Sequence, residues 1–291
     1  MRKIFLSSIT ILFASVVLFT GCDTSSDTSS NTSSSIQTST MTIDELKTNL
    51  NLKTPDPVAK KGSHILFVGN SHTFTNDLPQ IFYNMTLAFD KECEVYELTE
   101  GGYYLQQFDD PNDELGAKLE NGLKSTKLDF VILQDNTNAS ASDAPDKDMY
   151  PYITSLDTKI KQAGAQTALF MTWAPKNGIS STITLTRDEI QSTIANNYIT
   201  AANQIDGLLF PAGIAFSIVA DKYPEIELWD QDEMHPSLAG SYLTSCIMYA
   251  QLFQESPEGC TYIDELDPDT ASILQATANE LILKNNKQNT K

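Results

Sequence analysis

The polarity of the chain changes from a long apolar stretch to a polar tract, and then to a regular alternation of short apolar runs and amphipathic segments. Five apolar runs after residue 60 have the length of a strand, and each is continuous. Continuous apolar runs are typical of parallel strands that are covered on both faces. We therefore predict strands at HILFVG (64–69), CEVYELT (93–99), DFVILQ (129–134), TALFMTW (167–173) and GLLFPAG (207–213).

Segments of helical length lie between these strands and after the last one. Residues 76–90 carry apolar side chains along one stripe, and Asn76 is the expected N-cap of that helix. Further helices are predicted within residues 104–124, 148–164, 187–204, 237–254 and 269–286. Repeated strand and helix units predict an α/β fold, a three-layer α/β/α sandwich around a five-stranded parallel sheet of the flavodoxin-like type. Ligands of such folds bind beyond the carboxyl ends of the strands.

The first residues predict a secretion signal. Arg2 and Lys3 precede an apolar stretch that is short for a stable membrane span. The following FTGC ends on Cys22 and resembles the lipobox of bacterial lipoproteins, in which the signal is cut before a cysteine that carries lipid. We expect a lipoprotein signal peptide at 1–21 and a lipid-anchored protein outside the cytoplasm. An ordinary secretory signal and an uncleaved anchor are the alternatives.

The region 22–59 is expected to hold the folded part away from a membrane. Residues 23–40 are rich in serine and threonine and contain almost no large apolar side chain, so burial cannot offset the entropy of ordering them. We predict a flexible tether here, followed by a lead-in of short helix or extended chain that closes on prolines. Residues 60–291 form the predicted domain.

Charge and cysteine content limit the binding partners and cofactors that we expect. The formal net charge of −19 indicates a surface that repels phosphate backbones, so nucleic acid is not an expected partner. Beyond Cys22, the cysteines are Cys93, Cys246 and Cys260, without metal-type spacing, and a disulfide between the last two stays open. The chain has three histidines and no zinc-binding motif, and we expect neither a metal nor a cofactor. The oligomeric state also stays open.

The candidate catalytic residues are a serine and a histidine that has an aspartate close to it in the sequence. Ser71 lies two residues after Gly69, at the carboxyl end of the first predicted strand, where a side chain is presented at the rim of the sheet. His235 follows Asp232 by three residues, a spacing that puts both on one face of a turn. The carboxylate would orient the ring, and the ring would accept the serine proton. Read alone, GNSHT is also compatible with an ordinary polar turn or helix cap.

Together these residues resemble the SGNH or GDSL-like hydrolases, whose first block carries a nucleophilic serine and whose last block is D-x-x-H. ILFVGNSHTFTNDLP looks like the secreted bacterial branch with a glycine-asparagine-serine block, and Asn70 stands in place of the more usual aspartate. The resemblance covers residues 64 to about 255. It implies the SGNH hydrolase fold, with Ser71, Asp232 and His235 as the catalytic residues.

The same resemblance implies an oxyanion hole made of N–H groups, one of them from Ser71. LTEGGYYL matches the second block, which implies the Gly102 N–H, with Gly101 as the alternative. VILQDNTNAS stands at the third block, and register puts Asn136 on the family's asparagine, with Gln134 as the alternative amide donor.

Aromatic residues and missing motifs complete the prediction. Trp173 and Trp229 are expected near the rim of the site, where they would stack on a sugar or pack as ordinary aromatics, and His72 is expected in its wall. Thr73 replaces the last glycine of the G-x-S-x-G elbow, and no nucleotide-binding motif occurs. We predict a serine esterase that removes acyl groups, acetyl in first place, from an extracellular glycan or similar ester. The alternatives are a lipid or aryl esterase and a glycan-binding surface lipoprotein without turnover.

Overall fold

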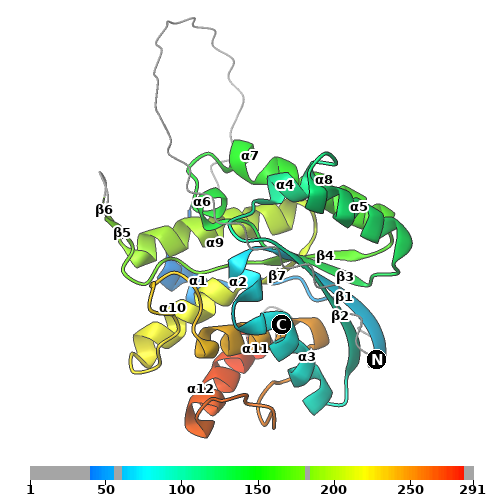
Figure 1. Ribbon diagram of the computed structural model, residues 1–291. Helices are drawn as coiled ribbons and strands as arrows, with labels where there is room; N and C mark the ends of the chain where they lie inside the picture. The colour runs from blue at the N-terminus through cyan, green and yellow to red at the C-terminus, as the bar shows by residue number, and fades with distance from the viewer. Residues whose placement is uncertain (1–39, 56–60, 181–183, 285–291) are drawn as a thin grey trace, which may run out of the picture. The chain divides into compact units, whose positions relative to one another are not determined.

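Five parallel strands form the central sheet, in the order β2, β1, β3, β4, β7 (Figure 1). The computed structural model describes residues 40–55, 61–180 and 184–284. The predicted five-stranded parallel sheet is confirmed, and each predicted strand is present. The strands are β1 (Lys61–Gly69), β2 (Glu92–Thr99), β3 (Phe130–Leu133), β4 (Gln166–Phe170) and β7 (Leu208–Phe210).

Two strands end three residues earlier than the apolar runs that predict them. β4 stops at Phe170 and β7 at Phe210. Pro211 ends β7, because proline has no N–H for the sheet ladder. The chain then turns directly into α10 (Ala212–Lys222), a helix that the apolar pattern does not predict.

Helices cover both faces of the sheet, which confirms the predicted α/β/α sandwich (Figure 1). One face carries α3 (Leu78–Ala88), α10, α11 (Leu238–Phe253) and α12 (Pro268–Asn279), which continues into η2 (Glu280–Lys284). The other carries α4 (Leu105–Asp109), α5 (Glu114–Ser125), α8 (Tyr150–Gln162) and α9 (Arg187–Gln204).

Short elements lie within the connections. Two of them, α2 (Ser71–Phe74) and η1 (Thr75–Asp77), join β1 to α3. Two more precede α8, namely α6 (Thr137–Ser140) and α7 (Pro145–Asp148). An antiparallel pair follows β4 and consists of β5 (Ile179–Ser180) and β6 (Thr184–Leu185).

The segment before β1 packs on the domain. α1 (Ile43–Asn49) starts with a capping box, in which Thr42 and Glu45 bond to each other's backbone N–H. Its buried Leu46 faces the core, and the helix contacts α9 and α10. Residues 40–55, which are predicted to belong to the lead-in, include part of the buried core. The domain boundary at residue 60 stays a prediction.

Polar residues follow three neighbouring strands at one edge of the sheet. Asn70 comes directly after β1, Glu100 after β2 and Gln134 after β3. Gly69 pairs with Thr99 across β1 and β2, and β3 runs parallel beside β1. The three loops therefore meet at the carboxyl edge, where ligands of open α/β sheets bind.

The predicted signal peptide, Cys22 and most of the serine-rich and threonine-rich tract lie outside the described residues, so these assignments stay predictions. Within residues 40–55, 61–180 and 184–284, no helix combines the length and the apolar composition that crossing a membrane requires.

Candidate active site

Ser71, His235 and Asp232 form one hydrogen-bonded row. The Oγ atom of Ser71 lies 2.7 Å from Nε2 of His235. The other ring nitrogen of His235, Nδ1, is hydrogen-bonded to Oδ2 of Asp232. The structure thus brings together a candidate nucleophile, a base and a carboxylate that orients the base, in the order of a serine hydrolase triad.

Ser71 begins α2, but the N-cap of this helix is the residue before it. Asn70 Oδ1 accepts a hydrogen bond from His72 N at 3.1 Å, so the helix is capped without the serine hydroxyl. The Ser71 hydroxyl is therefore left for His235. Asn70 also donates through Nδ2 to Tyr103 O at 2.9 Å. An aspartate could accept the first bond but could not donate the second, so this site suits an asparagine.

The Asp232 carboxylate holds both the ring of His235 and the loop that presents it. Its Oδ1 atom accepts hydrogen bonds from Met234 N at 3.0 Å and from His235 N at 2.9 Å. The loop is closed by Asp230 N, which donates to His235 O at 2.8 Å. The hydrogen bond to the His235 ring is the main reason that the pKa of Asp232 is lowered to about 2. At neutral pH this carboxylate is ionised, as an orienting group for a histidine must be.

His72 is buried beside the candidate base, which corrects the expectation that it lines the site. Its side chain is buried, and its ring centroid is 5.5 Å from that of His235 and 5.4 Å from that of Trp173. Burial lowers the pKa of His72 to about 4. The ring is therefore neutral at neutral pH, and it does not oppose a positive charge on His235 as a second imidazolium would.

Trp173 and Trp229 are not available to stack on a sugar, which corrects their assignment to the rim. They are only 1% and 4% exposed. The Trp173 ring stacks on Phe216 with centroids 3.9 Å apart, and its Nε1 donates to Met234 O at 3.0 Å. Trp229 Nε1 donates to Ala174 O at 3.1 Å. Both rings pack in the core, and Trp173 braces the loop that carries His235.

Gly102 has the left-handed backbone conformation of a tight turn, with φ of 74°. A Cβ atom at this position would meet nothing within 4 Å, so backbone conformation and not space calls for glycine. The Gly101 N–H is bound by Glu100 Oε1 at 3.1 Å. In the described part of the chain, no acceptor meets the Gly102 N–H. The structure therefore favours Gly102 over Gly101 as a donor to substrate.

Asn136 keeps one N–H for a ligand. Its Oδ1 accepts a hydrogen bond from Asn138 N at 3.0 Å, and its Nδ2 donates to Gly102 O at 3.0 Å. A primary amide carries two N–H bonds, so one remains. The bond to Gly102 O also ties this side chain to the other predicted donor.

Gln134, the alternative donor, instead supports the turn that carries Ser71, and its side chain is buried. Its Oε1 accepts hydrogen bonds from Asn70 N and Thr73 Oγ1, both at 2.8 Å, and its Nε2 donates to Asp135 O at 2.6 Å. A Cβ atom on Gly69 would lie 2.5 Å from this Oε1, so only glycine allows the approach. The sequence motifs do not predict this support; its one local signal is Gly69, since a glycine in a strand can mark the close approach of another group.

Asp135, between these two amides, is assigned no role by the sequence motifs. Its carboxyl group is fully buried at the carboxyl end of β3. A charged residue at the end of an apolar strand is the signal that could have singled it out, since buried carboxyl groups are rare without a partner.

In the part of the chain that the structure describes, the cysteines form no disulfide and the metal-binding residue types form no metal site. Cys93, Cys246 and Cys260 are buried and free, so Cys246 and Cys260 are not paired here. Across the described ranges, no group of three or more His, Cys, Asp or Glu residues is placed to hold a metal ion. That the protein needs no cofactor stays a prediction.

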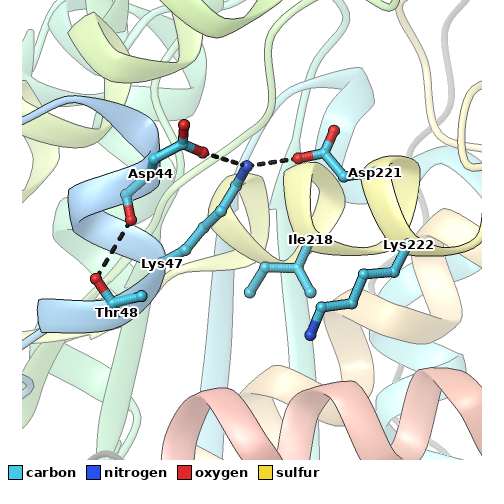
Figure 2. Close-up of a pocket in the computed structure, with 6 residues that line it drawn as sticks. All are labelled: Asp44, Lys47, Thr48, Ile218, Asp221 and Lys222. Atoms are coloured by element: carbon cyan, nitrogen blue, oxygen red, sulfur yellow. Dashed lines mark hydrogen bonds and ion pairs between the residues drawn. The ribbon is translucent and has the colours of Figure 1, made fainter.

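Two hollows of the described structure lie apart from Ser71. One, of about 360 Å³, is lined by Asp44, Lys47, Thr48, Ile218, Asp221 and Lys222, between α1 and α10 (Figure 2). There Lys47 pairs with Asp44 at 3.0 Å and with Asp221 at 2.6 Å. The other, of about 350 Å³, lies beside the His235 loop and is lined by Lys176 and by residues within 227–237.

Comparisons with known proteins find similar solved structures. No protein-family model and no curated protein matches the sequence. A protein from Slackia heliotrinireducens, described as a candidate SGNH hydrolase, is 26% identical with a TM-score of 0.58, over 66% of this chain and 100% of that one. A DUF4886 family protein from Bacteroides uniformis has a TM-score of 0.64 at 17% identity, over 78% of this chain and 96% of that one. A candidate GDSL-like lipase from Parabacteroides merdae has a TM-score of 0.51 at 14% identity, over 69% and 100%.

The Bacteroides uniformis and Parabacteroides merdae proteins are similar to this chain in fold. The Slackia heliotrinireducens protein is similar in fold and also in sequence. Together these similarities confirm the predicted SGNH hydrolase fold. The similarity to the Slackia heliotrinireducens protein also confirms the resemblance to SGNH hydrolases and supports an enzyme of the hydrolase class.

Proposed function

We propose that this chain is a serine esterase that removes acyl groups, acetyl in first place, from an extracellular glycan or a similar ester. The observation that carries the proposal is the 2.7 Å contact between Ser71 Oγ and His235 Nε2, with Asp232 bonded to the other ring nitrogen. The arrangement supplies a nucleophile, its base and the group that fixes the base's tautomer.

In the proposed reaction, His235 Nε2 accepts the Ser71 proton while Oγ attacks the ester carbonyl. Asp232 keeps the second proton on Nδ1 and stabilises the positive ring. The protonated His235 then donates to the leaving alcohol, and the acyl group remains on Ser71. In the second half, His235 takes a proton from water, the resulting hydroxide attacks the acyl carbon, and Ser71 regains its proton as the acid departs.

The negative oxygen of each tetrahedral intermediate would be held by N–H groups of Ser71, Gly102 and Asn136. The Ser71 N–H lies at the first position of α2, where the helix itself offers no acceptor. The hydrogen bond from Asn136 to Gly102 O keeps the other two donors at a fixed spacing. Each donor of this kind typically lowers the barrier by about 3 kcal/mol.

The exposure of the catalytic side chains supports a substrate with a large alcohol part and a short acyl group. The side chains of His235 and Asp232 are 30% and 49% exposed, so a polysaccharide can reach them from solvent. Phe74 follows Ser71 by three residues, and Met234 directly precedes His235. Their side chains are 40% and 45% exposed, so they would offer a substrate apolar contacts of small area. Neither described hollow is lined by Ser71, so neither receives an acyl chain bound to it.

The test compares p-nitrophenyl esters of acetate, butyrate and laurate, together with acetate release from an O-acetylated oligosaccharide. We expect kcat/KM to be highest for acetate and to fall with chain length. A preference for laurate would favour the lipid esterase instead. Folded protein that binds acetylated glycan but hydrolyses no ester would favour the binding lipoprotein.

We further propose that the protein is anchored outside the cytoplasm through lipid on Cys22. The support is the FTGC sequence after an apolar signal and before a polar tract. Cys22→Ala should release the protein from the membrane fraction or leave its signal uncut. Wild-type fractionation and wild-type electrophoretic mobility of this variant would rule out the anchor.

A further inference from the structure

Asp135 lies in the turn after β3, and its side chain joins two segments of the chain. The Oδ1 atom accepts hydrogen bonds from Leu105 N at 2.9 Å and from Asn136 N at 2.8 Å. The backbone N–H of Asp135 donates to the hydroxyl of the buried Tyr198 in α9, at 3.1 Å. A single buried oxygen atom of Asp135 therefore holds Asn136 N, from the next residue, and Leu105 N, from 30 residues earlier in the sequence.

Both linked segments carry a donor of the proposed oxyanion hole. Leu105 begins α4, three residues after Gly102, and only the N-cap residue separates α4 from the turn that contains Gly102. Asn136 supplies the side-chain donor and also bonds to Gly102 O. Groups that stabilise a transition state must be held within about 0.5 Å of the productive geometry. A change that frees either segment would therefore move both donors.

We propose that Asp135 is the positioning residue of the oxyanion hole, because its Oδ1 atom fixes the Gly102 turn and Asn136 relative to each other. The inference rests on the proposed esterase function. Because Asp135 is fully buried, it acts through the two backbone N–H groups from which it accepts hydrogen bonds.

The positioning requires an acceptor oxygen and not a negative charge. Burial raises the pKa of Asp135 to about 7, while the bonds from Leu105 N and Asn136 N oppose that rise. Among the described residues, no partner meets the second oxygen, Oδ2. Asparagine offers the same Oδ1 acceptor with an NH₂ group in place of Oδ2. Asp135→Asn should therefore keep the positioning, and Asp135→Ala should remove it.

The first experiment measures kcat and KM on an acetyl ester for Asp135→Ala, Asp135→Asn and the matched control Asp157→Ala, with thermal unfolding of each. Asp157 is also buried, accepts from Thr167 Oγ1 at 2.7 Å and pairs with Lys161 at 2.9 Å, away from the site. Asp135→Ala should lower kcat about 100-fold with little change in KM. Asp135→Asn should retain kcat within about threefold, and Asp157→Ala should lose stability but keep kcat.

Equal losses of kcat in Asp135→Ala and Asp157→Ala would overturn the proposal, and so would equal losses in Asp135→Ala and Asp135→Asn. A double-mutant cycle with Asn136→Ala gives a second criterion. With one donor already absent, Asp135→Ala should cost about tenfold or less, because residues that act together are not additive. An unchanged cost in that background would show that Asp135 does not act through Asn136. Asp135→Leu removes the acceptor but keeps the branched shape at Cγ, in case the alanine variant does not fold.

Backbone amide exchange tests the same hydrogen bonds without substrate. Asp135→Ala, or Asp135→Leu, should speed exchange at Leu105 and Asn136, whereas Asp135→Asn should not. Wild-type exchange at both amides in the folded alanine variant would contradict the proposal. If the proposed esterase function itself is wrong, the result is different. The wild-type protein would then show no ester turnover, or Ser71→Ala would retain it.

Discussion

His235 Nε2 lies 2.7 Å from Ser71 Oγ, although 164 positions separate the two residues in the sequence. Each partner stands on a turn that has its own hydrogen bonds. Asn70 caps the helix that begins with Ser71, and Asp232 accepts from the backbone of the loop that carries His235. Neither turn depends on the contact for its shape, so the contact is free to serve proton transfer.

Asp232→Asn should reduce kcat/KM on an acetyl ester severely, but by about 100-fold less than Ser71→Ala. The asparagine can still accept from Met234 N and His235 N, so the loop should keep its shape, while the His235 tautomer is no longer fixed. Asp230→Asn, in the same loop, is the matched control and should stay near wild type. Equal activity of the two asparagine variants would contradict the orienting role.

Asn136→Ala should mainly lose turnover, whereas Gln134→Ala should mainly lose stability. Asn136→Ala removes a proposed donor and should lower kcat by about 10²- to 10³-fold. Gln134→Ala leaves Asn70 N and the Thr73 hydroxyl without their buried acceptor, which should cost about 1–3 kcal/mol of unfolding free energy. Denaturant unfolding and kcat on one ester separate the two. Loss of kcat at Gln134 with unchanged stability would reverse the assignment.

Asp135→Asn should gain stability over wild type as pH rises. The pKa of Asp135 is about 7 when folded and near its ordinary 3.8 when unfolded, so between these values the folded state binds more protons. Wild-type stability from this group is full below pH 3.8 and falls as pH rises to about 7, by up to about 4 kcal/mol. Unfolding free energies of both proteins between pH 4 and 8 test this. A difference that does not change with pH would contradict the raised pKa.

Trp173→Phe should change stability and not glycan affinity. The phenyl ring can keep the contact with Phe216, but the hydrogen bond from Nε1 to Met234 O is lost, at a cost of about 1 kcal/mol. KM for an acetylated oligosaccharide should stay near wild type, relative to KM for an aryl acetate. A rise in KM for the oligosaccharide alone, at wild-type stability, would restore the sugar-stacking role.

The sequence predicts the sheet well because its signal is local. Strands that are buried on both faces need apolar residues at every position, and all four side chains of β3 are buried. The same signal misplaces the end of β7, because the apolar run continues past Pro211 into α10, and a buried helix and a buried strand look alike in composition.

The site could be predicted where residues of one motif act together, as Asp232 and His235 do across three positions. Other roles depend on partners far along the chain and have no local signal. Trp173 is buried because Phe216 and Met234 O lie beside it. Asp135 owes its role to Leu105, whose N–H it accepts.

The measurement that tests the catalytic proposal most directly is kcat/KM of Ser71→Ala on an acetyl ester, beside wild type, with thermal unfolding of both. Asn70 and not Ser71 caps α2, so the variant should unfold within a few degrees of wild type. Its kcat/KM should fall by about 10⁶-fold, since the nucleophile and its base act as one unit. Near-wild-type turnover by the folded Ser71→Ala protein would contradict the mechanism.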